Sequence, residues 1–149
     1  MTTYQPPKTG WAKMVPEILV NDFDKSLAFW TGPLGFNIAY ARIEERFAYL
    51  ERPEGAQVML SYRHGGWETG NLEQPFGRGV MFQIYVSDLD KIQSALELAE
   101  IKLHTGPREV WRNWGDREGG AKEIFIQDPD GYLLMIAQNI GERPLFDVD

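Results

Sequence analysis

The segment Ile-Leu-Val-Asn-Asp-Phe-Asp-Lys at residues 18–25 has a second copy, Ile-Tyr-Val-Ser-Asp-Leu-Asp-Lys, at residues 84–91. Both copies run from an apolar, β-branched stretch through an acidic turn into a helical pattern of apolar residues. The offset between them is constant at about 66 residues. The repeat predicts a chain built from two similar halves.

Each half is predicted to have the order strand, helix, strand, strand, strand. In the first half, a helix follows the capping residues Asn21 or Asp22, and strands are expected at residues 14–20, 36–43, 47–51 and 57–62. In the second half, a helix is expected at residues 89–100, and strands at residues 80–86, 102–112, 123–127 and 132–138. Residues 63–79, which are rich in glycine, are expected to link the halves, and residues 140–149 to form a tail.

The composition excludes several classes of protein. The chain has 149 residues, of which 43% are hydrophobic, so one well-packed domain is expected. Its net charge of −7 argues against a nucleic-acid partner, because phosphate binding needs a basic face. The lack of cysteine excludes disulfides and thiol nucleophiles, and no apolar run is long enough to cross a membrane. A cytoplasmic location is therefore expected.

Three motifs make the chain resemble a known superfamily. They are Val-Asn-Asp-Phe-Asp-Lys-Ser-Leu-Ala-Phe-Trp at residues 20–30, Leu-Gly-Phe at residues 34–36 and Asp-Pro-Asp-Gly-Tyr at residues 128–132. With the repeated halves, they resemble the vicinal oxygen chelate superfamily, which includes glyoxalase I, extradiol dioxygenases and bleomycin resistance proteins. The resemblance implies a single α+β domain in which two βαβββ modules, residues 14–62 and 80–139, form a curved mixed sheet around a cavity. The helices are expected on the outer face.

The resemblance also locates the positions at which metalloenzymes of the superfamily hold a divalent ion, with one His or Glu from each of four strands. These positions carry Val15, Met59, Met81 and Met135. Valine has no donor atom, and a thioether suits soft ions, so no metal and no cofactor are expected. The alternation of side chains along a strand supports this assignment of positions. A shift of one residue would point the aliphatic side chains of each strand, in place of the polar ones, toward the cavity. His64 and His104, the only histidines, fall in the linker and near a strand start, outside the expected cavity.

The predicted cavity face is apolar, with a few polar groups and one acid. Methionine fills irregular space and adapts to varied ligands, so this composition favours a small-molecule site. The alternative is that the methionines pack a closed core. The candidate residues on this face are Glu17, Gln57, Met59, Ser61, Met81, Gln83, Tyr85 and Met135.

Residues 111–115, Trp-Arg-Asn-Trp-Gly, precede an expected turn at Gly119-Gly120 and resemble the Trp-Gly segment at the binding groove of bleomycin resistance proteins. In those proteins, aromatic rings flank a flat, cationic ligand. The resemblance implies stacking roles for Trp114, Tyr40 and Phe47, with Trp111 beside them. The alternative is that both tryptophans cover the rim or a dimer contact.

The resemblance extends to assembly, because bleomycin resistance proteins are homodimers that exchange an amino-terminal strand. Residues 14–16, Met-Val-Pro, match the start of that strand, so a two-fold homodimer with grooves at the subunit boundary is expected.

The leading hypothesis for the function is a metal-free protein of the antibiotic-resistance type. It would sequester a planar or cationic small molecule and would have no catalytic residue. The alternative is a glyoxalase- or dioxygenase-related lyase or isomerase that uses a metal or Glu17 as base. A regulatory or oligomerising domain with a vestigial cavity is the third reading.

Overall fold

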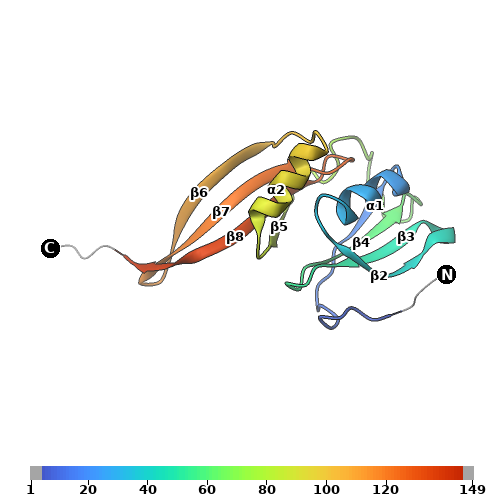
Figure 1. Ribbon diagram of the computed structural model, residues 1–149. Coiled ribbons are helices and arrows are strands. Elements are labelled where there is room, and N and C mark those ends of the chain that lie inside the picture. The colour runs from blue at the N-terminus through green and yellow to red at the C-terminus, as the bar shows by residue number, and fades with distance from the viewer. Residues whose placement is uncertain (1–4, 146–149) are drawn as a thin grey trace.

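The computed structural model describes residues 5–145, in which two four-stranded sheets lie side by side without closing into one (Figure 1). The sheets have the strand orders β1-β4-β3-β2 and β5-β8-β7-β6, and only the β1–β4 and β5–β8 pairs among them are parallel. The predicted α+β fold of two βαβββ halves is confirmed. The elements are β1 (Glu17–Val20), α1 (Phe23–Thr31), β2 (Asn37–Arg42), η1 (Ile43–Glu45), β3 (Phe47–Glu51), β4 (Gln57–Tyr62), β5 (Met81–Tyr85), α2 (Leu89–Leu98), β6 (Thr105–Trp114), β7 (Arg117–Gln127) and β8 (Leu133–Pro144).

The repeated acidic turn serves as the helix cap in both halves. The Asp22 carboxylate accepts a hydrogen bond of 3.1 Å from the Lys25 amide, and Asp88 accepts one of 3.2 Å from the Lys91 amide. Each bond satisfies one of the free amides at a helix start, which explains why the same residues recur. Neither α1 nor α2, the two α-helices within residues 5–145, is long and apolar enough to span a membrane.

The core confirms the predicted alternation of strand faces. One face of each sheet packs against the helices and is aliphatic, while the other face carries the polar residues and methionines. Phe82, which strand alternation places in the aliphatic row, is only partly buried but packs against the core. The buried members of that row are Ile18, Val20, Val58, Leu60, Ile84, Leu134 and Ile136.

The hairpin of β6 and β7 corrects one expectation. Gly119 and Gly120 were expected to form a turn, but they lie inside β7, and the chain turns between Trp114 and Arg117. A Cβ at Gly120 would stand 2.8 Å from the Trp111 ring, so glycine is needed there because the indole lies against the backbone. Strands β7 and β8 therefore extend further than expected, and β8 continues to Pro144 within the predicted tail.

The Asp-Pro-Asp-Gly-Tyr motif joins the two halves. The Tyr132 hydroxyl donates a hydrogen bond of 2.9 Å to the Leu19 carbonyl in β1, and the Asp130 carboxylate accepts one of 3.3 Å from the Asn21 amide. The Asp130 carbonyl also accepts a bond of 2.8 Å from the Phe76 amide of the linker. This turn, which we call the clasp (residues 128–132), holds β1, the linker and the second sheet in one arrangement.

Asp128 makes the clasp sensitive to pH. Its carboxylate is buried and accepts hydrogen bonds from the Trp30 indole (3.3 Å) and the Tyr132 amide (2.9 Å). Burial dominates and raises its pKa to about 6 from an ordinary value of 3.8. The folded protein therefore holds a proton that the unfolded chain releases at lower pH. The stability from this group is complete below the unfolded pKa and is lost as pH rises through about 6.

We expect Asp128→Asn to remove this pH dependence. The difference in unfolding free energy between the original protein and the variant should change by up to about 3 kcal/mol between pH 3.5 and 7, because one pKa unit is worth about 1.4 kcal/mol. Urea unfolding at several pH values measures it. Asp116→Asn, in the exposed β6–β7 turn, is the control for loss of a carboxylate at the surface. A difference for Asp128→Asn that does not vary with pH would contradict the prediction.

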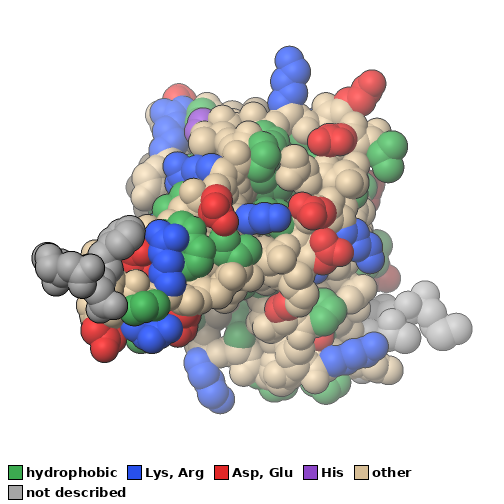
Figure 2. Space-filling model, turned by 60° about the vertical axis from the view of Figure 1, so that its left-hand side comes forward, with side chains coloured by type: hydrophobic (Ala, Val, Ile, Leu, Met, Phe, Trp, Pro, Cys, Tyr) green, Lys and Arg blue, Asp and Glu red, His purple; other side chains and the backbone are tan. Residues whose placement is uncertain are grey.

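The surface shows no large region of one charge on the face in Figure 2, where acidic and basic side chains alternate around hydrophobic side chains. This mixture agrees with the modest net charge of −7. Long-range attraction of a strongly charged polymer is therefore not favoured by this face.

Candidate functional site

A groove of about 380 Å³ lies on the polar face of the second sheet. Tyr85 from β5, Arg112 and Trp114 from β6, and Asn139 from β8 line it. The Trp114 and Tyr85 side chains are 54% and 49% exposed, so both rings are open to solvent. We call this the aromatic groove. It suits a flat molecule that stacks on the rings and hydrogen-bonds at its edges.

A charged network lies beside the groove. The Glu123 side chain is completely buried, and Arg112 donates to both of its carboxylate oxygens at 2.6 and 3.0 Å. Arg108 adds a third bond of 3.2 Å. Hydrogen bonds from Arg112 hold the pKa of Glu123 below its usual value, although burial opposes them. Two cations against one anion leave a net positive charge here, and the Arg112 guanidinium is held in a defined orientation.

Sequence reasoning missed this network, although a signal was present. Glu123, Phe125 and Met135 share one face because strands alternate, and Phe125 pairs with Met135. A charged residue on that face in a central strand requires a partner. Arg108 stands opposite Glu123 in the strand register. The pairing of β6 with β7 would therefore have identified Arg108 as the partner.

The polar face of the first sheet carries a cluster of aromatic rings. Tyr40 stacks on Tyr49 with ring centroids 5.2 Å apart, and Phe47 lies 5.9 Å from Tyr40. Trp11, which precedes β1, meets Tyr40 and Tyr49 edge-on at 6.1 and 5.4 Å. Met59 pairs with both Glu17 and Tyr49 in the strand register, so it lies on the same face.

The amino-terminal arm, residues 8–12, covers this face. The Gln57 side chain accepts a hydrogen bond of 3.0 Å from the Ala12 amide and donates one of 3.1 Å to the Thr9 hydroxyl. Both carboxylate oxygens of Glu51 lie 2.9 Å from the Lys8 amide nitrogen. The sequence did not indicate this contact, because a Pro- and Gly-containing arm carries no periodic pattern. In a single chain, the arm fills space that was expected to belong to the ligand.

The structure divides the predicted site residues among four places. Trp111 lies on the face of β6 opposite to Trp114, because three residues along a strand reverse the side, and the Arg143 guanidinium sits 4.0 Å from its ring centroid. Glu17, on the edge strand β1 and on the same face of the first sheet as Met59, lines a second pocket at the junction of the two sheets. The polar face of the second sheet carries Met81, Gln83, Tyr85, Trp114 and Met135, and that of the first sheet carries Tyr40, Phe47, Met59 and Ser61.

The residues at the superfamily's metal positions do not fit a divalent ion. Val15 offers no donor atom, and Met59, Met81 and Met135 offer only thioethers, which suit soft ions. Across residues 5–145, no group of three or more His, Cys, Asp or Glu side chains comes together in a way that could hold a metal ion. The side chains of the aromatic groove offer stacking, hydrogen bonding and ion pairing.

Residues 12–136 match the sequence profile of the Glyoxalase/Bleomycin resistance protein/Dioxygenase superfamily. The chain belongs to this superfamily. A probable lactoylglutathione lyase from Vibrio parahaemolyticus is 28% identical over 128 residues, which cover 80% of this chain and 85% of that protein. The match agrees with the resemblance read from the repeated halves and the clasp motif.

Solved structures share the fold. A virulence protein from Salmonella typhimurium has a TM-score of 0.63 at 21% identity, with 87% of this chain and 97% of the other covered. A lactoylglutathione lyase from Agrobacterium tumefaciens has a TM-score of 0.56 at 18% identity, with 89% and 95% covered. Identities this low support the architecture alone, so the bleomycin resistance subtype stays a prediction.

Proposed function

We propose that this superfamily member binds a small planar molecule in the aromatic groove without a divalent ion. The observation that carries the proposal is the pair of open rings, Trp114 and Tyr85, in one groove that Arg112 and Asn139 also line. A flat ligand would stack on the rings and place its polar edge against the guanidinium and the amide. The replaced metal positions favour binding over metal-assisted catalysis.

We also propose that a second copy of the chain completes the groove, as in bleomycin resistance proteins. Met81, Tyr85 and Trp114 are large, exposed side chains on one face of a sheet that is open in the single chain. Such a surface is typical of an interface or a ligand site. The arm that covers the first sheet could make the same contacts on a partner, because exchange of an identical segment preserves every bond. Sedimentation of a single species at twice the mass of the chain would support this proposal.

The binding proposal is tested with metal-free bleomycin as the probe and calorimetry as the readout. We expect Trp114→Leu to weaken binding at least about tenfold, or about 1.4 kcal/mol, because one stacked ring is lost. Trp111→Leu is the matched control, since this ring lies on the opposite face of the same strand, and its effect should stay below about twofold. Equal losses in both variants, or no binding of the probe, would contradict the proposal.

The second candidate is a lyase, and its support is the similarity to the protein from Vibrio parahaemolyticus that is named a probable lactoylglutathione lyase. The donor set at the metal positions argues against a metal-dependent form of this activity. Formation of lactoylglutathione, measured with Ni²⁺ or Zn²⁺ added and with metal content determined by elemental analysis, separates the two candidates. Metal-dependent turnover with stoichiometric metal retention would favour the lyase.

A further inference from the structure

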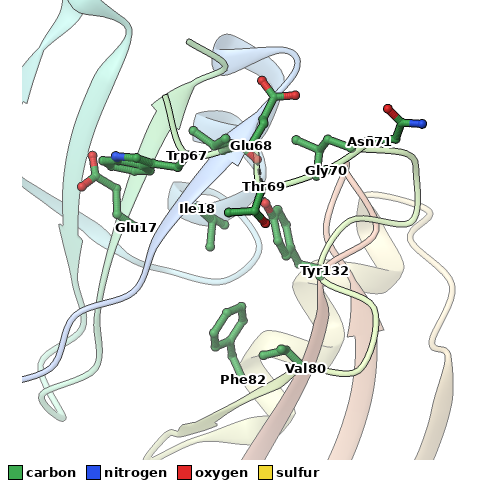
Figure 3. Close-up of a pocket in the computed structure, with 13 residues that line it drawn as sticks. Glu17, Ile18, Trp67, Glu68, Thr69, Gly70, Asn71, Val80, Phe82 and Tyr132 are labelled. Carbon is green, nitrogen blue, oxygen red and sulfur yellow. Dashed lines mark hydrogen bonds between the residues drawn. The ribbon is translucent and has the colours of Figure 1, made fainter. Parts of the chain in front are cut away.

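A second pocket, of about 440 Å³, lies at the junction of the two halves (Figure 3). Its walls come from β1, from the linker and from β5 together with Tyr132 of the clasp. None of its lining residues belongs to the aromatic groove. We call it the junction pocket. A ligand in this pocket would not touch the residues of the aromatic groove, so its binding does not depend on the proposed function.

The Glu17 carboxylate is the uncommitted charge of the junction pocket. Within residues 5–145, no donor lies within hydrogen-bonding distance of it. Burial raises its pKa, while the nearby positive charges of Arg42 and His64 lower it. Neither of these neighbours reaches it, because Arg42 is bound to Glu45 at 2.8 Å and the His64 ring packs edge-on against Trp67. Among residues 5–145, Glu17 is thus a partly desolvated anion without a hydrogen-bond or ion-pair partner.

The second acid of the pocket, Glu68, is already paired. Its carboxylate accepts a hydrogen bond of 2.9 Å from the Arg63 Nε, and this bond lowers its pKa. The pair contributes no net charge to the pocket. A ligand would therefore meet a single free negative charge, that of Glu17.

The other walls of the junction pocket are aromatic and aliphatic. Trp67 is 51% exposed, and Figure 3 shows its indole beside the Glu17 carboxylate. Phe82 and Leu72 provide apolar surface. Tyr132 contributes its ring alone, since its hydroxyl is engaged with the Leu19 carbonyl. An ammonium group can lie between a carboxylate and the face of an indole while its hydrocarbon part contacts apolar walls.

We propose that the junction pocket binds an organic amine in its protonated form, through an ion pair with Glu17 and a cation–π contact with Trp67. An anion would be repelled by Glu17, and a neutral apolar molecule would leave the carboxylate desolvated and unpaired. A metal ion would find only one free carboxylate, which is too few ligands. A protonated amine with an aromatic or aliphatic body satisfies both the charge and the walls.

The probe for this site is 2-phenylethylamine, and its uncharged counterpart is 2-phenylethanol. The readout is the set of indole N–H signals in a two-dimensional nitrogen–proton NMR spectrum at pH 7, with the Trp67 signal identified from Trp67→Phe. We expect the amine to shift the Trp67 signal in a saturable manner and to leave the Trp114 signal in place. The alcohol should bind at least tenfold more weakly, because it lacks the positive charge.

The variant Glu17→Gln keeps the shape of the side chain and removes its charge. It should weaken amine binding at least fivefold and leave the weak binding of the alcohol unchanged. Glu97→Gln, on the exposed side of α2, removes the same charge from a distant place and should leave both affinities as they were. Equal affinities for amine and alcohol, or amine binding that survives Glu17→Gln, would overturn the proposal.

This test is separable from that of the aromatic groove. A shift of the Trp114 signal in place of the Trp67 signal would assign the amine to the groove and overturn the junction site. Failure of bleomycin to bind, with the amine response at Trp67 intact, would reject the groove proposal and keep this one. Absence of any amine-induced shift would reject the junction site alone.

Discussion

We expect replacement of both Arg108 and Arg112 with methionine to lower the free energy of unfolding by about 3–5 kcal/mol, because the buried carboxylate of Glu123 loses every cationic partner that the structure gives it within residues 5–145. Glu123→Gln costs less, about 1 kcal/mol, since the two arginines are 44% and 52% exposed and can turn to water. The asymmetry follows from which partner is buried.

Urea unfolding at pH 7 measures this effect. Arg117→Met is the matched control. Arg117 lies in β7 and forms an ion pair with Glu142, but both side chains are about half exposed. Loss of this ion pair should lower the free energy of unfolding by less than about 1 kcal/mol. The double variant should also become less stable as pH rises, because its Glu123 is no longer held ionised. A double variant no less stable than Glu123→Gln would show that the buried charge does not govern this region.

We expect replacement of Gly131 with alanine to lower the free energy of unfolding by about 3–4 kcal/mol and to weaken the contacts of the clasp. Gly131 has φ +94°, and an added Cβ would stand 2.5 Å from the Pro75 Cβ and 2.6 Å from the Pro75 Cα. The backbone of the linker would have to move away from the turn. The hydrogen bond from the Phe76 amide to the Asp130 carbonyl would then break.

Gly55→Ala is the control for this substitution. Gly55 has a similar φ of +109°, but an added Cβ there meets nothing within 4 Å. Gly55→Ala should therefore lower the free energy of unfolding only by the cost of placing a residue with a Cβ at positive φ, about 1–2 kcal/mol. Hydrogen exchange of the Phe76 amide should accelerate in Gly131→Ala and stay unchanged in Gly55→Ala, apart from the global loss of stability. Equal losses of stability in the two variants would rule out the steric contact as the cause.

The fold was predictable because its signals are local. Repeated caps at Asp22 and Asp88 begin the two helices, and alternation along each strand separates the aliphatic row from the polar row. The sequence-based predictions were wrong where a residue is chosen for its packing against a neighbouring strand. Gly119 and Gly120 look like a turn in sequence, but Gly120 makes room for the Trp111 ring inside β7.

The candidate site was predictable only in part. Tyr85 and Trp114 lie together because both are on the polar face of the second sheet, whereas Tyr40 and Phe47, which were expected beside Trp114, lie on the first sheet. Glu17 and Trp114, which were expected to share one cavity, line separate pockets because the two sheets lie side by side and do not close around a common space. Trp111 was grouped with Trp114 by proximity in sequence, and the period of the strand places the two rings on opposite faces.

By itself, the sequence determined the two-part βαβββ architecture and the alternation of aliphatic and polar residues along the strands. These properties depend on residue type and on short, regular spacing, which a sequence displays directly. Only the tertiary structure decided that the arm covers the first sheet, that Glu123 is buried between two arginines and that Glu17 faces Trp67. Such contacts join segments far apart in the chain, and they depend on how whole elements pack, which no local pattern records.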